Sequence, residues 1–204
     1  MADDVLTIGV LLFDDVEELD VVGPWEVLGF WASHIATSLV RVVALGPQVG
    51  VVRGSKGLGM VADHAMDEAL PLDLLVHPGG NGTRGLVKDA AHLEWLRGLH
   101  ERGTVLASVC TGSLVLAAAG LLADRPATTH RDYLEKLAKT DPSIEVRRGD
   151  RFVDDGTVVT SAGVSAGIDM ALHLVARYDG PEAAEFTRAG IQYEAPAAVP
   201  GSGA

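Results

Sequence analysis

The strongest constraint on the fold is an alternation of short apolar runs of strand length with longer segments of helical patterning. The runs lack the apolar–polar alternation of a half-exposed strand, so they indicate strands buried on both faces. The predicted central strands are residues 5–13, 39–45, 72–77, 104–109 and 157–160. The predicted helices are residues 24–33, 86–102, 111–119, 166–178 and 181–192. This order predicts an α/β fold with a doubly wound, mostly parallel sheet and helices on both faces.

The domain organisation is simple. No internal repeat or linker interrupts residues 1–194, which we expect to form a single domain. The glycine-punctuated residues 50–61 indicate an excursion or a hairpin within it. Residues 195–204 are rich in Pro, Ala and Gly and predict a loose tail.

Composition excludes several classes of protein. With 48% apolar residues, the chain can bury a core and is not disordered. Sixteen Lys and Arg against 28 Asp and Glu give a net charge of −12, and there is no basic block, so we expect no nucleic-acid partner. The longest apolar segments, 5–13 and 113–123, are shorter than the roughly 20 residues that span a bilayer. The acidic N-terminus does not resemble a signal peptide, so we expect a cytoplasmic protein without membrane contact.

The single cysteine, Cys110, lies where a buried strand is expected to meet a helix. Small residues two positions before and after it, Ser108 and Gly112, permit a sharp strand-to-helix turn of the nucleophile-elbow type. Free N–H groups at the start of the helix are expected to lower the thiol pKa. A lone cysteine is also commonly a small buried hydrophobe. Its place at the carboxyl end of a strand favours the catalytic interpretation.

An acidic run follows the first predicted strand and reaches the same edge of the sheet. Its members are Asp14, Asp15, Glu17, Glu18 and Asp20. Such runs are usually solvated, but Asp20 lies between Leu19 and Val21 and is the member best placed to face inward. Crowding or burial would raise its pKa and suit it to proton transfer with Cys110.

Two glycine motifs resemble known signatures but lack their context. Residues 80–85 read G-x-G-x-x-G, yet they follow the third strand and no acid is placed for a ribose, so a tight turn with exposed N–H groups is the better interpretation. Residues 163–167 read G-x-S-x-G, but only His173 follows, too close for the hydrolase order. The seven histidines show no metal-ligand spacing, although His77 and His130 lie near strand ends. We therefore expect no metal and no dinucleotide cofactor.

Taken together, these motifs resemble the ThiJ/PfpI superfamily and, within it, the isonitrile hydratase branch. The motifs that carry the resemblance are EELDVVGPWEVL (17–28), HPGGNGTRGL (77–86), SVCTGSLVLAAAGLL (108–122), ATTHRDYLEKL (127–137) and SAGVSAGIDMAL (161–172). The resemblance implies a flavodoxin-like fold, a homodimer and no cofactor. It implies that Cys110 is the nucleophile and Asp20 the acid/base carboxylate. It places Thr111, Gly79 and Gly80 in the substrate pocket, with Gly80 and the Thr111 amide as backbone donors.

Two positions depart from the pattern of relatives. The peptidase branch has His directly after the nucleophile, where this chain has Thr111, which argues against peptidase chemistry. Relatives often have an aromatic residue after TTH, where this chain has Arg131, so the polarity of the pocket and the choice of substrate stay open.

The resemblance implies hydration of an isonitrile, R–NC, to an N-substituted formamide through a cysteine thioimidate. Two alternatives stay open. One is a glyoxalase-like enzyme in which Cys110 adds to an α-oxoaldehyde. The other is a non-catalytic thiol sensor, which would show ready oxidation of Cys110 without consumption of a substrate.

Overall fold

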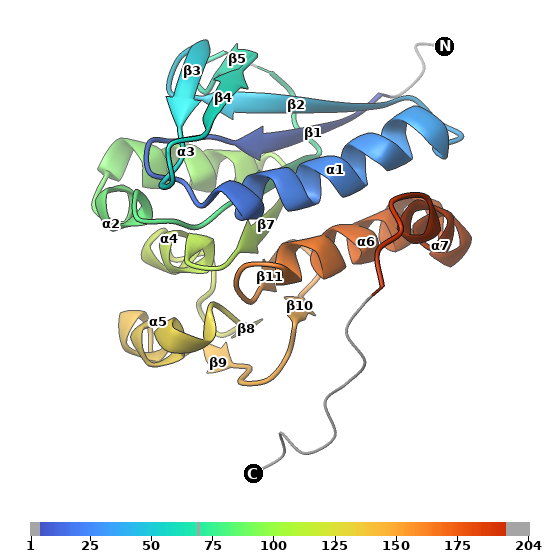
Figure 1. The fold of residues 1–204 in the computed structure, drawn as a ribbon. Helices are drawn as coiled ribbons and strands as arrows, with labels where there is room; N and C mark the ends of the chain where they lie inside the picture. Colours follow the sequence, from blue (N-terminus) through green and yellow to red (C-terminus); the bar gives the residue numbers. More distant parts are fainter. Residues whose placement is uncertain (1–4, 69, 195–204) are drawn as a thin grey trace.

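A computed structural model describes residues 5–68 and 70–194 of the chain, and it contains one central seven-stranded sheet (Figure 1). Its strands, in spatial order, are β10 (Phe152–Asp154), β11 (Val158–Ser161), β7 (Val105–Val109), β6 (Leu74–His77), β1 (Leu6–Leu11), β2 (Val40–Gly46) and β5 (His64–Ala65). All neighbours are parallel except β10, which pairs antiparallel with β11. The chain therefore has the mostly parallel, flavodoxin-like α/β fold that the sequence predicts.

Helices cover both faces of this sheet (Figure 1). α1 (Glu18–His34), α6 (Ala166–Asp179) and α7 (Pro181–Gly190) pack together on one face. α3 (Ala90–Glu101) lies on the other face and contacts α4 (Gly112–Ala118). The short helices α2 (Thr83–Leu86) and α5 (Leu134–Thr140) also contact α4. A 3-10 turn, Arg131–Tyr133, precedes α5.

The central strands are buried on both faces, as their apolar sequences predict. Every residue of β6 and β11 is buried, and so is every residue of β1 after Leu6. From β1 the chain passes through α1, on one face, to β2, whereas from β6 it passes through α3, on the other face, to β7. The strand order therefore reverses between β1 and β6, and in open α/β sheets ligands bind at the carboxyl edge of the sheet at such a point. That edge carries the loops after β1, β6 and β7.

Two small sheets flank the main one. The predicted hairpin at 50–61 is present as β3 (Gly50–Arg53) paired antiparallel with β4 (Gly59–Ala62). β8 (Pro126–Ala127) and β9 (Glu145–Val146) form a parallel pair instead of joining the central sheet. Backbone bridges from Val16 to Gly54 and Gly80 join the β3–β4 hairpin and the loop after β6 to the acidic loop after β1.

Two helix boundaries differ from the prediction. Helix α1 begins at Glu18 and has Pro24 in its interior, so the expectation of a start at Pro24 is wrong. Asp20 therefore lies in the first helical turn, where the helix backbone fixes it, rather than in a loop. The helix predicted from residue 86 begins only at Ala90, because the Asp89 side chain caps it by accepting hydrogen bonds from the N–H groups of Ala91 and His92. Leu86 is instead the last residue of the separate short helix α2.

The predicted tail, residues 195–204, lies outside the described residues. Among the helices of the described residues, none is long and apolar enough to cross a bilayer.

Candidate active site

Cys110 occupies a strained turn between β7 and α4. Its φ is +57°, a left-handed conformation that non-glycine residues rarely adopt without a local constraint. Its carbonyl accepts hydrogen bonds from Thr129 Oγ1 at 2.8 Å and Ser113 Oγ at 3.1 Å, and its N–H donates to the Ser161 carbonyl at 3.1 Å. Three elements of the fold thus hold the backbone of the predicted nucleophile elbow in place.

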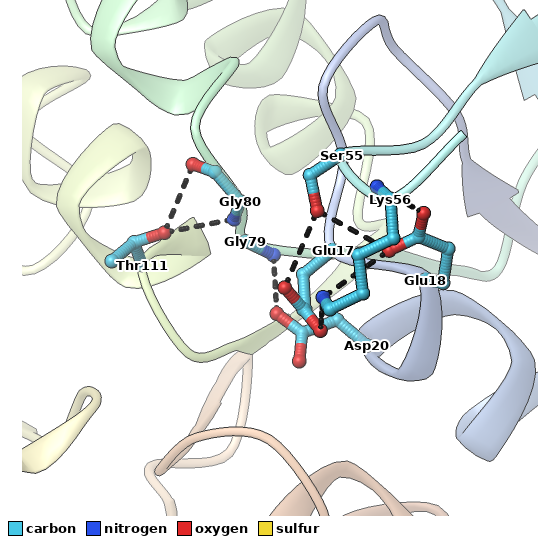
Figure 2. Close-up of polar contacts among 8 residues, drawn as sticks. All are labelled: Glu17, Glu18, Asp20, Ser55, Lys56, Gly79, Gly80 and Thr111. Atoms are coloured by element: carbon cyan, nitrogen blue, oxygen red, sulfur yellow. Dashed lines mark hydrogen bonds and ion pairs between the residues drawn. The ribbon is translucent and has the colours of Figure 1, made fainter. Parts of the chain in front are cut away.

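Asp20 faces inward from the first turn of α1 and is fully buried. Its Oδ2 accepts a hydrogen bond of 2.9 Å from the Gly79 N–H, as Figure 2 shows. Its Oδ1 has no hydrogen-bond partner among the described residues, and the thiol of Cys110 lies beside the carboxyl group. The one cysteine of the chain and one buried carboxyl group therefore meet at the carboxyl edge of the sheet.

The proton affinities of both groups are raised. Burial raises the pKa of Asp20 from 3.8 to about 7, although the Gly79 N–H opposes this. Burial, together with the negative charge of Asp20, raises the pKa of the Cys110 thiol to about 12. The N–H of Thr111 lowers the thiol pKa, as expected for the start of a helix, but the expectation of a net decrease is wrong because desolvation dominates.

The turn after β6 is linked to Thr111 by a small hydrogen-bond network. The Gly80 N–H donates to Thr111 Oγ1 at 3.0 Å (Figure 2). Thr83 Oγ1 donates to the Gly80 carbonyl at 2.7 Å. The N–H groups of Gly79 and Gly80 are thus engaged by Asp20 and Thr111. They position the site, and Gly80 also lines the cavity above Cys110. That Gly80 and the Thr111 amide donate to a substrate stays a prediction.

Two other acids of the run, Glu17 and Glu18, bind the turn of the β3–β4 hairpin. Lys56 Nζ lies 2.5 Å from Glu17 Oε1 and 3.4 Å from Glu18 Oε2, and the Lys56 N–H donates to Glu18 Oε1 (Figure 2). Ser55 Oγ adds a hydrogen bond of 3.2 Å to Glu18. Asp14 and Asp15 are exposed, as expected for a solvated run, whereas Glu17 and Glu18 are structural ion-pair partners of Lys56.

A cavity of about 170 Å³ opens above Cys110. Its lining residues are Glu17, Gly80, Asn81, Thr83, Arg84, Cys110, Thr111, Leu114, His130, Tyr133, Lys136 and Val164. A side chain at Gly163 would collide with both the His130 ring and the Cys110 sulfur, because its Cβ would lie 2.1 Å and 3.1 Å from their nearest atoms. The G-x-S-x-G motif therefore acts as a tight turn against the cavity, as predicted, while Ser165 is exposed.

Other residues singled out in the sequence lie elsewhere. The side chain of Arg131 is 89% exposed and does not line the cavity, so it leaves the polarity around Cys110 unchanged. His77 is fully buried beneath the Pro78–Gly80 turn, with its Nε2 3.0 Å from Nε2 of His92. Burial lowers the pKa of His77 to about 3, so the ring is neutral at pH 7. Within residues 5–68 and 70–194, no group of three potential metal-ligating side chains gathers.

Several cavity residues were not singled out by sequence reasoning. Thr83 and Arg84 come from the G-x-G-x-x-G segment, and Tyr133 and Lys136 come from the TTHRDYLEKL segment. Both segments carry recognisable motifs. The cavity, however, forms between several separate elements, and the spacing of residues within a short helix does not show which of its side chains face that cavity.

Gly80→Ala should disrupt this site. Gly80 has a φ of +123°, and a Cβ there would lie 2.3 Å from the Glu17 nitrogen and 2.6 Å from the Asp15 carbonyl oxygen. Backbone atoms cannot move aside cheaply, so we expect a loss of about 3 kcal/mol in the free energy of unfolding. Urea denaturation measures it, with Gly85→Ala as control, because a Cβ at Gly85 meets nothing within 4 Å. Equal denaturation midpoints for the two variants would contradict the expectation.

Fold and site together define a flavodoxin-like α/β protein with a cysteine on a left-handed strand-to-helix turn, facing a buried carboxyl group. The chain belongs to the DJ-1/PfpI family, whose family model matches residues 6–177.

Known relatives extend this likeness along most of the chain. It is 37% identical over 188 residues to an isonitrile hydratase of Pseudomonas putida, covering 92% of this chain and 78% of that protein. It is 35% identical over 153 residues to an HTH-type transcriptional regulator of Pseudomonas aeruginosa, covering 75% of this chain and 45% of the regulator's length. Among solved structures, a ThiJ/PfpI family protein from Pseudomonas syringae superposes with a TM-score of 0.83 at 27% identity, over 98% of this chain and 80% of that one.

Proposed function

We propose that this protein is an isonitrile hydratase, which converts R–NC into the N-substituted formamide R–NH–CHO. The observation that carries the proposal is the pairing of the buried Asp20 carboxyl group with the Cys110 thiol beneath a small cavity. The 37% identity to the Pseudomonas putida isonitrile hydratase supports the choice of substrate.

In the first half-reaction, the Cys110 sulfur attacks the terminal carbon of the isonitrile. The thiol proton passes to the Asp20 carboxylate, and Asp20 delivers it to the same carbon. A C–S and a C–H bond form, nothing is released, and the product is the thioimidate Cys110–S–CH=N–R. Covalent catalysis of this kind divides one difficult addition into two easier steps.

In the second half-reaction, water adds to the thioimidate carbon. Asp20 is again ionised; it takes a proton from the attacking water and passes that proton to the substrate nitrogen. The tetrahedral species then breaks its C–S bond, the formamide leaves, and the sulfur regains its proton. The two hydrogens of the water end on the nitrogen and on the thiol, so atoms and charges balance.

The raised pKa values suit this sequence of steps. Because the thiol pKa is about 12, the sulfur keeps its proton at rest and becomes a nucleophile only as Asp20 accepts that proton. Because the Asp20 pKa is about 7, the carboxyl group can accept and return a proton near neutral pH. The unpartnered Oδ1 leaves one lone-pair site of this carboxyl group open to the reacting groups.

The direct test is the ultraviolet change when purified protein is mixed with 4-nitrophenyl isocyanide, with the product identified by mass spectrometry. We expect the formamide, and in H₂¹⁸O we expect one ¹⁸O in its carbonyl group. If the isonitrile persists while methylglyoxal is converted to lactate without glutathione, the glyoxalase-like alternative replaces this proposal. If neither compound is consumed and Cys110 oxidises readily with peroxide, the thiol-sensor alternative replaces it.

The proposal includes a homodimer. Val51 and Val61 face each other across the β3–β4 hairpin, and they are 66% and 59% exposed. Leu19 and Val22 on α1 are also exposed, each at 39%. Exposed apolar side chains on neighbouring elements favour an interface with a second copy. The cytoplasmic location and the lack of a nucleic-acid partner stay predictions from the sequence.

Replacing both hairpin valines, Val51→Asp and Val61→Asp, should dissociate this dimer. Burying two carboxylates at an apolar interface costs enough to raise the dissociation constant about 100-fold or more. Light scattering coupled to gel filtration measures the mass. Phe186→Asp is the control, because Phe186 is 62% exposed on α7, away from the hairpin. A monomeric wild-type protein, or a double variant that stays dimeric, would contradict the proposal.

A further inference from the structure

Two basic side chains line the cavity that contains the Cys110 sulfur. Arg84 comes from α2 and Lys136 from α5, and these two helices both contact α4, the helix that follows the nucleophile. In Figure 1, α2 and α5 lie on opposite sides of α4. The cavity is therefore flanked by positive charge from two directions.

Neither cation has a carboxylate partner within the described part of the chain. Arg84 and Lys136 form none of the ion pairs seen among residues 5–68 and 70–194. Lys136 Nζ instead lies 6.0 Å from the centre of the Tyr133 ring, which also lines the cavity. The face of an aromatic ring attracts a cation, so Tyr133 helps to keep the ammonium group over the cavity.

Among residues 5–68 and 70–194, one acidic side chain lines the cavity, and its charge is already compensated. Glu17 lies 2.5 Å from Lys56 Nζ, and Lys56 belongs to the β3–β4 hairpin rather than to the cavity lining. The chain has 28 acidic residues and a net charge of −12, so carboxylates are abundant enough to pair with every basic side chain near the site. The opening is instead locally positive on an acidic protein.

We propose that Arg84 and Lys136 bind the carboxylate of an anionic substrate whose reacting carbon reaches Cys110. The inference rests on the proposed function and narrows its substrate class to small isonitriles that carry a carboxylate. Both cations are exposed at the cavity opening, whereas Asp20 is buried beneath it. The neutral isocyano group thus enters next to Asp20 while the substrate's charge stays outside. The guanidinium of Arg84 can donate two parallel hydrogen bonds to a carboxylate, and Lys136 adds a mobile charge.

A matched pair of substrates tests this charge selection. We expect the wild-type protein to hydrate 4-isocyanobenzoate with a kcat/KM about tenfold higher than that of its methyl ester, as two exposed charge contacts would give together. The difference should lie mainly in KM and should shrink with added salt. In the double variant Arg84→Gln/Lys136→Gln, the ratio should fall to near one. A wild-type ratio of one, or a tenfold ratio retained in the double variant, would overturn the proposal.

The control variant removes the same charge from the same region without touching the cavity. Lys88 follows α2 and Lys139 lies in α5, and neither lines the cavity around Cys110. Lys88→Gln/Lys139→Gln should keep the wild-type ratio. If it lost the preference as fully as the cavity variant, the effect would belong to overall charge and the proposal would fail.

A second readout separates this inference from the proposed function. Iodoacetate and iodoacetamide alkylate the same thiol, each losing iodide as the C–S bond forms, and they differ in charge. Because Cys110 is the single cysteine, the added mass reports on this site alone. The ratio of the iodoacetate rate to the iodoacetamide rate should fall about tenfold in the cavity variant and stay constant in the control. If this result appeared without any isonitrile hydration, the anion site would stand and the proposed reaction would fail; an unchanged ratio would overturn the anion site.

Discussion

Cys110→Ala should reduce formamide production by about 10³-fold or more while leaving the fold intact. In the proposed mechanism the sulfur forms the bond to the isonitrile carbon, and no other cysteine in the sequence can replace it. Alanine meets the same left-handed backbone demand at φ +57° as cysteine, so the turn gains no new strain. Turnover of 4-nitrophenyl isocyanide measures the first effect, and the thermal midpoint measures the second.

Ser108→Ala provides the matched control for this truncation. Ser108 lies in β7, two residues before Cys110, and its buried hydroxyl has no hydrogen-bond partner within the described residues. Its removal should therefore leave both turnover and stability close to wild type. Rapid acid quenching should trap the wild-type thioimidate as an adduct with the mass of the whole isonitrile, absent from Cys110→Ala. An alanine variant that still produced formamide would remove Cys110 from the mechanism.

The sequence predicts the central fold because the apolar runs and their order constrain it strongly. Five parallel strands buried on both faces leave little choice of architecture once helices alternate with them. The β5 strand, with only His64 and Ala65, carries no such signal. Helix α1 was predicted too short because proline usually marks a first turn, whereas here Pro24 lies within a helix that starts at Glu18.

The sequence predicts those features of the candidate site that follow from a residue's position along the chain. It does not predict those that arise from packing between separate elements. Cys110 and Asp20 each follow a central strand, so their convergence at one sheet edge could be anticipated. The rise of the thiol pKa could not, because it depends on how completely helix α1 and the loop after β6 exclude water. The same holds for Arg84 and Lys136, whose common cavity arises from contacts between separate helices.

Asp20→Asn should remove most turnover and also remove its pH dependence near neutrality. Proton transfer by a positioned carboxyl group contributes about 10²- to 10⁴-fold, so we expect a loss in this range. The active Cys110–Asp20 pair holds one proton in total, and a second proton binds as the pH falls below about 7. Wild-type kcat/KM should thus rise with pH through about 7, and the Asn variant should show no such rise. Asp14→Asn, an exposed member of the same run, should retain the wild-type profile.

Relative to the wild type, the Asp20→Asn variant should become more stable as the pH rises. The native Asp20 binds its proton more tightly than the unfolded chain does, so folding is progressively disfavoured from about pH 4 to about pH 7. At about 1.4 kcal/mol per pKa unit, the wild-type cost between pH 5 and pH 8 is on the order of 3 kcal/mol. Asparagine carries no charge, so the difference in unfolding free energy between variant and wild type should move in favour of the variant by this amount over the interval. Urea denaturation at both pH values measures it. A pH-independent difference would mean that Asp20 titrates normally and does not serve as the proton carrier near pH 7.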